Sequence, residues 1–324
     1  MNLRVLGRLA MAMCLAIVST PTPAQSFPDR PLRLVVPFSA GGVTDIVARA
    51  AAERLSRSLG QTVVVENRTG ANGAVAIDTL MQAPPDGYTL FLATIGNLAI
   101  NPAVYPDLRY STDKDFQIIG LLSSVPQLFV VGKALPVNSV DEFVAYAKAN
   151  PGKLSYGSSG VGSAPHMAGA IFASRAGIQV NHIPYRGSSQ SITDLIGGQL
   201  SFMIDPVTTT LPYVQSGKVR AIAVSTPHRL AALPDVPTIA ESGFPGYDVG
   251  VWNAIAVRAG TPAPVVDRLV KELRAVVQDA SFARQIATSG AEPLVDNPEG
   301  ARRFIAAEQQ KYADIIRRLK IRAE

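Results

Sequence analysis

The stretch VVPFSAGGVTD, residues 35–45, decides how this chain folds and where its site lies. A run of apolar, strand-forming residues from Leu32 to Phe38 breaks there at a loop of small residues, 39–42. The helix expected after the loop carries an apolar face made of Val47, Ala51, Leu55 and Leu59. A strand, a tight loop and a helix N-terminus leave unpaired N–H groups and the positive end of a helix dipole above the sheet. The junction therefore predicts either an anion-binding site or an ordinary turn.

Strand and helix patterns continue to alternate after this junction, with short breaks between them. Such alternation is typical of α/β folds with a doubly wound parallel sheet. We expect strands at Leu32–Phe38, Gln61–Glu66, Tyr88–Ala93, Leu154–Gly157, Val180–Tyr185, Leu200–Ile204 and Ala221–Val224. We expect helices at Asp45–Ser58, Gly73–Gln82, Ser139–Ala149, Ser163–Ala176, Ser189–Ile196, Thr209–Gln215, Pro264–Gln278, Ser281–Ala287, and Glu299 to about Arg318.

Two long extended segments indicate that the chain passes twice between two α/β halves. The first, Phe116–Val131, consists of two apolar pieces separated by Pro126. The second, Tyr247–Val257, follows a Pro-rich region. The expected fold is two-lobed with two crossing hinge strands, at Leu122–Val131 and Val249–Val257. Lobe 1 is expected to hold residues 27–124 and 250–324, and lobe 2 residues 125–249.

Residues 1–26 have the pattern of a secretory signal peptide. Arg4 and Arg8 precede a short apolar run, and a Ser/Thr/Pro segment follows it. The run is shorter than the roughly 20 residues that a transmembrane helix needs. We therefore expect a periplasmic protein, cleaved after Ala24 or Ser26. The single cysteine, Cys14, lies inside this segment, so disulfides and thiolate chemistry are excluded from the mature chain.

The composition, 47% hydrophobic and 17% charged, is that of a folded globular protein. The formal charge of +5 includes Arg4 and Arg8, and without them 28 basic residues face 25 acidic ones. The basic residues are mixed with acidic ones and form no stripe interleaved with aromatics. Nucleic acid is therefore not an expected partner.

Three loops share one composition, and each follows an expected strand: 39–45, 94–97 and 157–163. All are small, contain glycine and carry hydroxyl or amide groups. In an open α/β sheet, ligands bind outside the carboxyl ends of the strands, so loops of both lobes are expected to meet at one crevice. The sequence thus predicts a clamp for a small anion. Its expected contacts are Phe38, Ser39, Ala40, Gly41, Gly42, Val43, Thr44, Asp45, Thr94, Ile95, Gly96, Asn97, Ser158, Ser159, Ser163, His166 and Asp205.

Three polar residues near these loops leave two readings open. His166 stands one helical turn after Ser163 and either packs beside the helix start or faces the crevice. Asp205 ends an expected buried strand and either caps the next turn or faces the crevice, where it would take a cationic group or hold a water against the ligand. Arg186 is either a surface residue or a ligand contact.

Signatures of catalysis are missing from these loops. Residues 157–161 fail the serine-hydrolase pattern G-x-S-x-G because Val161 replaces the last glycine. Neither nucleotide-binding glycine pattern is present, and no His, Asp or Glu spacing resembles a metal site. We expect no cofactor, no metal and no catalytic residue. The alternative is a periplasmic hydrolase or lyase acting on a small organic acid, with Ser159 and His166 as its pair.

Several longer strings resemble one known family over nearly the whole mature chain. They are PFSAGGVTDIVAR (37–49), GQTVVVENRTGANGAVA (60–76), PPDGYTLFLAT (84–94), PGKLSYGSSGVGSAPHMAG (151–169), HIPYRGSSQSITDLIGGQLSFMID (182–205), GKVRAIAVSTPHRLAALPDVPTIAESGFPGY (217–247) and GTPAP (260–264). These strings resemble the Bug (Bordetella uptake gene) receptors, the periplasmic solute-binding proteins of tripartite tricarboxylate transporters.

The resemblance implies a type II-like periplasmic binding protein fold and capture of a small carboxylate by loops of both lobes. It also implies delivery of the ligand to membrane permease subunits, or presentation to a sensor kinase, by a monomeric receptor. Asp205 matches the family's acidic position, which suits an amine in members that bind amino acids. Which carboxylate this chain binds stays open, because Val43, the Ala164-Pro165 pair and Pro206 depart from the family's common residues.

Overall fold

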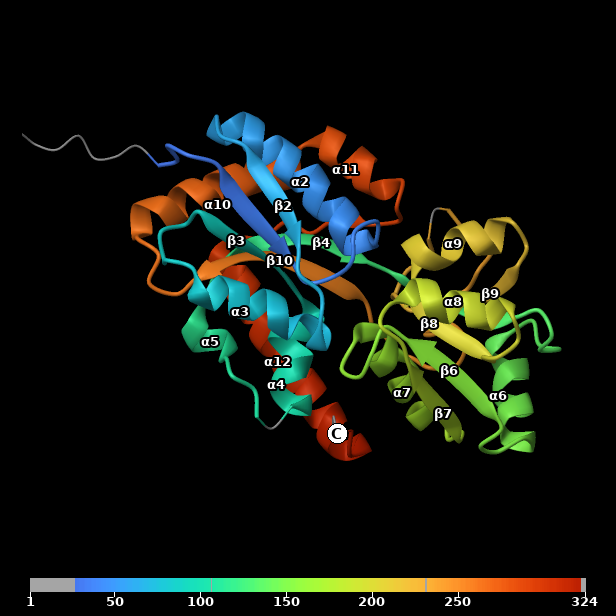
Figure 1. The fold of residues 1–324 in the computed structure, drawn as a ribbon. Helices are drawn as coiled ribbons and strands as arrows, with labels where there is room; N and C mark the ends of the chain where they lie inside the picture. The colour runs from blue at the N-terminus through green and yellow to red at the C-terminus, as the bar shows by residue number, and fades with distance from the viewer. Residues whose placement is uncertain (1–26, 106, 231, 322–324) are drawn as a thin grey trace, which may run out of the picture.

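The computed structural model describes residues 27–105, 107–230 and 232–321, and its elements form two α/β lobes (Figure 1). The expected signal peptide lies outside the described residues. In the first lobe the strands run in the order β11-β4-β10-β3-β1-β2. They are β1 (Leu32–Val36), β2 (Val63–Asn67), β3 (Thr89–Thr94), β4 (Phe116–Val125), β10 (Val251–Arg258) and β11 (Glu292–Pro293).

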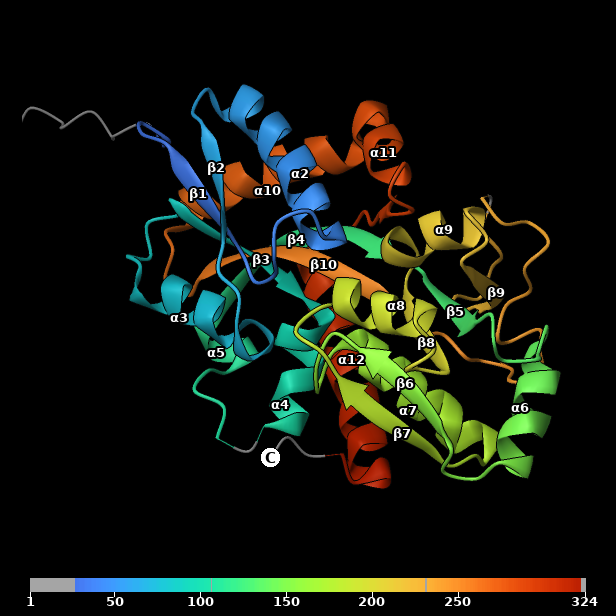
Figure 2. The same ribbon diagram turned by 45° about the vertical axis from the view of Figure 1, so that its right-hand side comes forward.

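Helices cover both faces of this first sheet (Figures 1 and 2). One face packs against α2 (Val43–Leu59), α10 (Ala263–Gln278) and α11 (Ala280–Ala287). The other face packs against α3 (Ala74–Gln82) and α12 (Pro298–Leu319), next to the short turns η1 (Ala71–Gly73), η2 (Gly96–Ile100), α4 (Asn101–Val104) and α5 (Thr112–Asp115). Helix α12 buries Ile305, Tyr312 and Ile316 and packs against η2, α4 and β4. The C-terminal helix therefore belongs to the first lobe.

The second lobe repeats this layered plan around a smaller sheet. Its strands run in the order β7-β6-β8-β5-β9 and are β5 (Gln127–Gly132), β6 (Leu154–Ser158), β7 (Val180–Pro184), β8 (Phe202–Pro206) and β9 (Val219–Val224). The helices are α6 (Val140–Ala149), α7 (Ala164–Ala176), α8 (Ser188–Ile196) and α9 (Val207–Gln215). The core contains a cluster of aromatic rings around Phe129 of β5. The centre of its ring lies 4.9 Å from that of Phe143, 4.8 Å from that of Phe172 and 5.3 Å from that of Phe202.

Both sheets are mixed, whereas the alternation of strands and helices is typical of a doubly wound parallel sheet. Strands β1, β2 and β3 are parallel, but β10 pairs antiparallel with β3 and β4. In the second sheet, β6 is parallel to β7 and β8, whereas β5 is antiparallel to β8 and β9. The short strand β11 also pairs antiparallel with β4. Strands β5 and β10 are those that the chain enters on arrival from the other lobe. Only strands joined by a helical crossover within one lobe need to be parallel.

The two lobes are joined where β4 passes through Pro126 into β5, and where residues 225–250 return to β10. The side-chain amide of Gln127 donates to the Val249 carbonyl over 2.9 Å, so the outgoing and returning segments are bonded to each other. Ser225 also bonds to Gln127, with its hydroxyl 3.0 Å from the Gln127 backbone nitrogen. The two crossings therefore lie side by side between the lobes.

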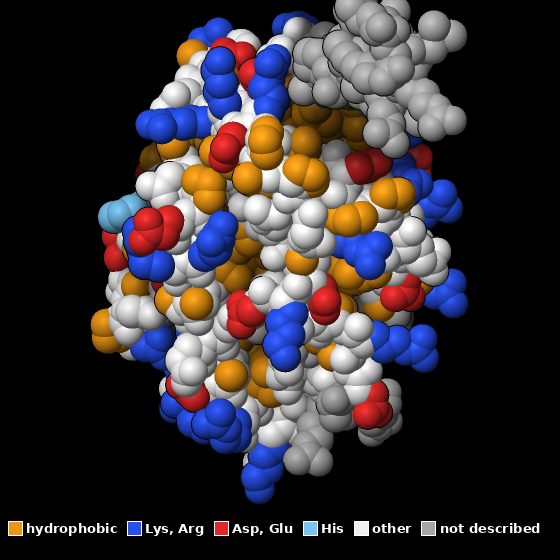
Figure 3. Space-filling view, turned by 90° about the vertical axis from the view of Figure 1, so that its left-hand side faces the viewer, with side chains coloured by type: hydrophobic (Ala, Val, Ile, Leu, Met, Phe, Trp, Pro, Cys, Tyr) orange, Lys and Arg blue, Asp and Glu red, His pale blue; other side chains and the backbone are white. Residues whose placement is uncertain are grey.

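Helix α6 begins at a side-chain cap, and charges of both signs are mixed on the surface. Ser139 caps α6, since its hydroxyl accepts from the Glu142 N–H over 3.2 Å. Basic and acidic side chains alternate over the face shown in Figure 3, without a patch of one sign. Among the described residues, no helix has both the length and the apolar character of a membrane span.

Candidate functional site

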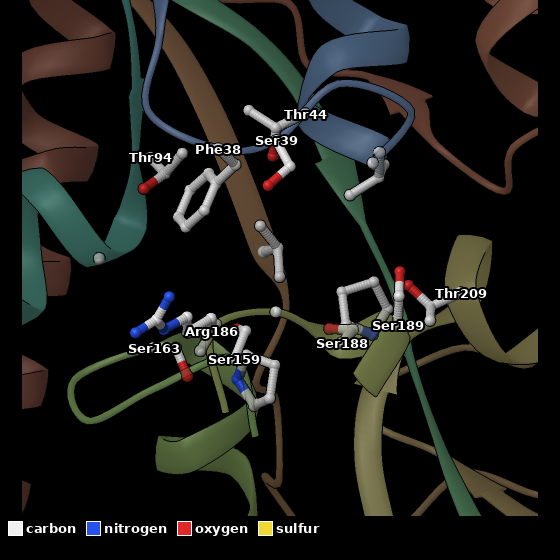
Figure 4. A pocket seen from close by; sticks show the side chains of 18 of the residues that line it. Phe38, Ser39, Thr44, Thr94, Ser159, Ser163, Arg186, Ser188, Ser189 and Thr209 are labelled. Carbon is white, nitrogen blue, oxygen red and sulfur yellow. The ribbon is translucent and has the colours of Figure 1, made fainter. Parts of the chain in front are cut away.

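A cavity of about 450 Å³ opens between the lobes at the carboxyl ends of their strands (Figure 4). Its size falls within the range of small-molecule sites, roughly 300 to 1,000 Å³. The first lobe lines it with Phe38, Ser39, Ala40, Gly41, Gly42, Val43, Thr44, Asn72, Thr94, Ile95, Gly96 and Val251. The second lobe lines it with Ser159, Ser163, Ala164, Pro165, Arg186, Gly187, Ser188, Ser189, Gln190, Pro206 and Thr209.

Three helices begin at the wall of this cavity without a side-chain cap. The N-cap residues are Gly42 for α2, Gly187 for α8 and Pro206 for α9, and none of them gives a side-chain hydrogen bond to its helix. The Val207 N–H of α9 donates to the Pro126 carbonyl over 2.9 Å, but no described side chain takes the first backbone N–H groups of these helices. The positive ends of three helix dipoles thus meet at one cavity. This arrangement favours an anion.

Asp45, a predicted ligand contact, does not line the cavity but holds the loop that does. Its Oδ2 accepts from the Gly41 N–H and from Arg49 Nε, each over 2.9 Å. Its Oδ1 accepts from the Asn67 amide, which also donates to the Phe38 carbonyl. Burial raises the pKa of Asp45, but these hydrogen bonds outweigh it, and the pKa lies below the ordinary value. The carboxylate therefore stays ionised and its charge is compensated by Arg49.

The expected loop 94–97 is instead the start of a helical segment. Residues Gly96–Ile100 form a π-helical turn that leads into α4, because the apolar side chains after Asn97 pack into the core. Asn97 is fully buried and its Oδ1 accepts from the Thr94 hydroxyl over 2.9 Å. Its amide donates to the Asn72 carbonyl over 2.8 Å. Asn97 thus lies behind the cavity wall, while Thr94, Ile95 and Gly96 line it.

Asp205, another predicted contact, is fully buried behind Ser188, Pro206 and Thr209, which line the cavity. The Ser188 hydroxyl donates to its Oδ1 over 2.8 Å, and its Oδ2 makes no hydrogen bond of good geometry with any described residue. Burial raises the pKa of Asp205 to about 7, although the hydroxyls of Ser188 and Thr209 act to lower it. The carboxyl group therefore does not touch the cavity itself and is connected to it by the hydrogen bond from Ser188.

Comparison with known proteins identifies the family. A family model described as the tripartite tricarboxylate transporter family receptor matches residues 47–321. The chain belongs to this receptor family. It is similar to the protein BugT of Bordetella pertussis, with 34% identity over 315 residues that cover 97% of each chain.

Solved structures of similar proteins share the fold of this receptor. The structure of Rpa4515 of R. palustris with adipate has a TM-score of 0.86 and 35% identity, covering 91% of this chain and 98% of that chain. The periplasmic binding protein BugD has a TM-score of 0.84 and 38% identity, covering 92% of this chain and all, 100%, of that chain. The expected two-lobed periplasmic binding protein fold is confirmed.

The alternative catalytic pair is not formed in this receptor. His166 is buried and does not line the cavity, and its Nδ1 accepts from the Gly162 N–H over 3.2 Å. The His166 ring stacks on the His182 ring, with 4.0 Å between the ring centres. Ser158 Oγ lies 2.6 Å from His182 Nε2. Burial lowers the pKa of His166 to about 3, with His182 acting in the same direction, and burial lowers the pKa of His182 to about 4.

This group of neutral side chains, Ser158, His166 and His182, supports the loop 158–163 from behind. Ser159 and Ser163 remain at the cavity, and no hydrogen bond joins Ser159 to His166 in the described part of the chain. Family and structural neighbours are likewise solute-binding receptors. The hydrolase hypothesis is therefore wrong in its choice of base.

Several lining residues of the receptor were not among the predicted contacts. Residues 186–190 lie between β7 and the first turn of α8, and Pro206 and Thr209 lie at the end of β8 and the start of α9, so they obey the same rule as the loops that were predicted. The string Arg186-Gly187-Ser188-Ser189 carries the small and hydroxyl-bearing composition that would have identified them. No local signal marks Val251 or Asn72, which reach the cavity through the return strand and the 3₁₀ turn η1.

The described residues contain no group of His, Cys, Asp or Glu side chains that could hold a metal ion. Hydroxyl, amide and backbone N–H groups make up the polar lining of the cavity, together with Arg186. The wall can therefore donate hydrogen bonds to an anion from both lobes.

Proposed function

We propose that this receptor captures a small organic carboxylate in the cavity between its lobes. The observation that carries the proposal is the meeting of three uncapped helix N-termini at a cavity whose described lining has no acidic side chain. A helix N-terminus stabilises a nearby anion by about 0.3–1 kcal/mol, and more where it is partly buried. The adipate bound to the similar protein Rpa4515 supports a carboxylate as the ligand class.

The proposed contacts are divided between the lobes. The loop 38–44 and the start of α2 hold one carboxylate by backbone N–H groups, with the hydroxyls of Ser39 and Thr44 as further donors. The Thr94 hydroxyl lines the cavity but donates to Asn97. The second lobe contributes the Ser159 hydroxyl and the backbone N–H groups at the start of α8. The hydroxyls of Ser163, Ser188 and Thr209 line the cavity but are bonded to the Gly160 carbonyl and to Asp205. Asp45, Asn97, Ser158, His166 and Asp205 act from behind these residues. Charge-assisted hydrogen bonds of this kind are about twice as strong as neutral ones.

The lobes, taken as residues 27–124 with 250–324 and residues 125–249, would close on the ligand about the crossings at Leu122–Val131 and Val249–Val257. The first sheet draws its strands from residues 32–125 and 251–293, and the second from 127–224, which supports this division. Ligand-induced compaction measured by small-angle X-ray scattering tests the closure.

The receptor would act in the periplasm, as a monomer, and pass its ligand to permease subunits or present it to a sensor kinase. The signal-like pattern of residues 1–26 and the family of the chain support this location. Intact-mass analysis of the periplasmic fraction tests it, because cleavage after Ala24 or Ser26 gives distinct masses.

A pair of substitutions at Gly42 tests the anion site directly. Gly42 has an ordinary φ of −77° as the N-cap of α2, so a side chain fits its backbone conformation. Asp and Asn are both favourable N-caps, so Gly42→Asp and Gly42→Asn should fold equally well. Only Gly42→Asp places a negative charge at the proposed carboxylate position. We expect Gly42→Asp to abolish binding of carboxylates and Gly42→Asn to retain a measurable part of it.

The ligand itself is identified by native mass spectrometry of the purified protein, followed by a thermal-shift screen of dicarboxylates, tricarboxylates, aromatic acids and acidic amino acids. A ligand at 100 times its dissociation constant stabilises the folded state by about 2.7 kcal/mol, which such a screen detects. Matched amides serve as neutral controls. Stabilisation by the amides equal to that by the acids, or equal binding by the two Gly42 variants, would contradict the proposal.

A further inference from the structure

Arg186 carries the charge of the cavity wall. It lies between β7 and Gly187, the N-cap of α8, and it is the charged side chain among the described residues that line the cavity. In the described part of the chain its guanidinium takes part in no ion pair or hydrogen bond. A guanidinium offers donors in a planar fork that fits a carboxylate. Arg186 is thus available to an anion inside the cavity.

Hydrogen bonds of the neighbouring residue Tyr185 fix the position of the Arg186 backbone in the second lobe. The Tyr185 N–H donates to the Ser158 carbonyl over 3.0 Å, and the Tyr185 hydroxyl donates to Asp194 over 2.7 Å. These bonds hold the end of β7 against the loop 158–163. Figure 4 shows Arg186 extending from this wall on the side of the cavity where Thr94 lies. The guanidinium therefore approaches a ligand from a different side than the start of α2.

Three acidic groups that neighbour lining residues are engaged elsewhere. Asp194 accepts from Tyr185, Asp205 accepts from Ser188 behind the wall, and Asp45 binds Arg49 and the Gly41 N–H. None of these carboxyl groups lines the cavity. The anion that Arg186 can pair with must therefore come from the ligand.

We propose that Arg186 binds a second acidic group of the ligand and selects dicarboxylates over monocarboxylates of the same chain length. The inference rests on the carboxylate-binding function proposed above, in which one carboxylate lies at the helix N-termini. Arg186 is exposed in this arrangement of the lobes, where an ion pair in water is weak. The pair becomes stronger when the ligand fills the cavity and displaces water, because the local dielectric constant falls.

Titration calorimetry with matched acids tests this role, using succinate against butyrate and adipate against hexanoate. We expect the wild type to bind a diacid at least tenfold more tightly than its monoacid, as a charge-assisted hydrogen bond predicts. Arg186→Gln should lose roughly tenfold or more in affinity for the diacid and keep its affinity for the monoacid. Arg186→Lys should fall between them, because it keeps the charge but loses the planar fork.

The control variant is Arg284→Gln, which removes the same charge from an exposed position on α11 outside the cavity. It should bind every acid like the wild type. Both variants should unfold at the wild-type temperature without ligand, since neither arginine takes part in a described hydrogen bond or ion pair. An unchanged affinity of Arg186→Gln for the diacid, or an equal loss for both acids of a pair, overturns the role of Arg186. Absence of wild-type binding to any carboxylate overturns the proposed function itself.

Discussion

Three carboxyl and amide side chains next to the cavity form hydrogen bonds with other groups of the protein, and they do not point into the cavity. Asp45 accepts from the backbone of its own loop, and Asn97 ties Thr94 to Asn72. Asp205 Oδ1 accepts a hydrogen bond from the Ser188 hydroxyl. An ionised carboxylate at the cavity surface would repel an anionic ligand and compete for the N–H donors of α2. These residues therefore shape the wall without presenting a negative charge to the cavity, and they occupy the donors of Gly41, Thr94 and Ser188.

Asp45→Ala should destabilise the protein by about 1–3 kcal/mol, because Gly41, Arg49 and Asn67 lose a charged acceptor that is 3% exposed. The pKa of Asp45 is lowered in the folded state. Its contribution is thus present above the unfolded pKa of about 3.9 and is lost as the pH falls through the folded pKa. Urea unfolding at pH 7 measures the loss, and Asp235→Ala at an exposed position is the control. Equal midpoints for the two variants would contradict this role.

The pH dependence of stability should reveal Asp205. Its folded pKa of about 7 lies above the unfolded value of about 3.9, so the folded state binds the proton more tightly. The sign follows from linkage: stability falls as the pH rises from about 4 to about 7, and the penalty is constant above that range. Asp205→Asn keeps the shape of the side chain but cannot titrate. The difference in melting temperature, wild type minus variant, should therefore decrease between pH 4 and pH 7.

The difference between two proteins is needed because the histidine pair acts in the opposite direction. The folded pKa values of His166 and His182, about 3 and about 4, lie below the unfolded value of about 6.5. Their contribution is present at neutral pH and is lost as the pH falls below about 6.5. This loss is common to the wild type and Asp205→Asn and cancels in the difference. A flat difference across the range would show that Asp205 does not bind its proton more tightly on folding.

The sequence could predict which loops surround the cavity, but not the direction of every side chain on them. Phe38 to Thr44 line the cavity as the strand, loop and helix pattern led us to expect. Asp45 stands next in the sequence and turns away, because its partners Asn67 and Arg49 are brought to it by β2 and by the helical turn of α2. The direction of the Asp45 side chain thus depends on hydrogen-bond partners, one of which is distant in the sequence and cannot be recognised from the local pattern of residues.

At the scale of helices and strands, most expected elements are present with ends shifted by one or two residues. The helical segment after Asn97 was missed, because the glycine and the amide in residues 94–97 are typical of a loop. The direction of β5 and β10 was also missed, since an apolar run gives no information on whether its neighbours are parallel. Pairing within a sheet depends on the path of the chain between lobes and not on the composition of one strand.

The 3₁₀ turn η1 depends on a glycine at its end. Gly73 has a φ of +93°, and a Cβ there would lie 2.3 Å from the Asn97 amide nitrogen and 3.0 Å from Pro37 Cβ. Gly73→Ala should therefore cost more than the 1–2 kcal/mol of a left-handed backbone alone. It should also weaken carboxylate binding, because Asn97 and Asn72 support the wall at Thr94.

The control for this prediction is Gly152→Ala, where φ is +70° and no atom lies within 4 Å of the added Cβ. It carries the backbone strain without the contact. Denaturant unfolding and calorimetry on both variants separate the two effects. Equal destabilisation by the two substitutions, with ligand affinity unchanged, would show that Asn97 and Pro37 yield to the new methyl group at no cost.

At the scale of the whole molecule, the loop that lines the cavity from the second lobe also touches the first lobe. The Tyr105 hydroxyl donates to the Val161 carbonyl over 3.2 Å. Beside it, a Cβ added at Gly162 would lie 3.3 Å from the Asn72 amide nitrogen and 3.4 Å from Asn101 Oδ1, so the two lobes approach closely here. Residues that would contact the ligand are thus coupled to the arrangement of the lobes.

Tyr105→Phe should shift the lobes towards more open arrangements, because it removes the hydrogen bond between them and keeps the ring. A neutral hydrogen bond contributes about 0.5–1.5 kcal/mol, so the dissociation constant should rise by roughly 2- to 10-fold, mainly through faster dissociation. Scattering should give a larger radius of gyration for the variant without ligand and the same radius as the wild type with ligand. Tyr146→Phe on α6, whose hydroxyl takes part in no described hydrogen bond, should behave as the wild type in both measurements. An unchanged radius together with an unchanged dissociation rate in Tyr105→Phe would mean that the Tyr105–Val161 contact does not hold the lobes.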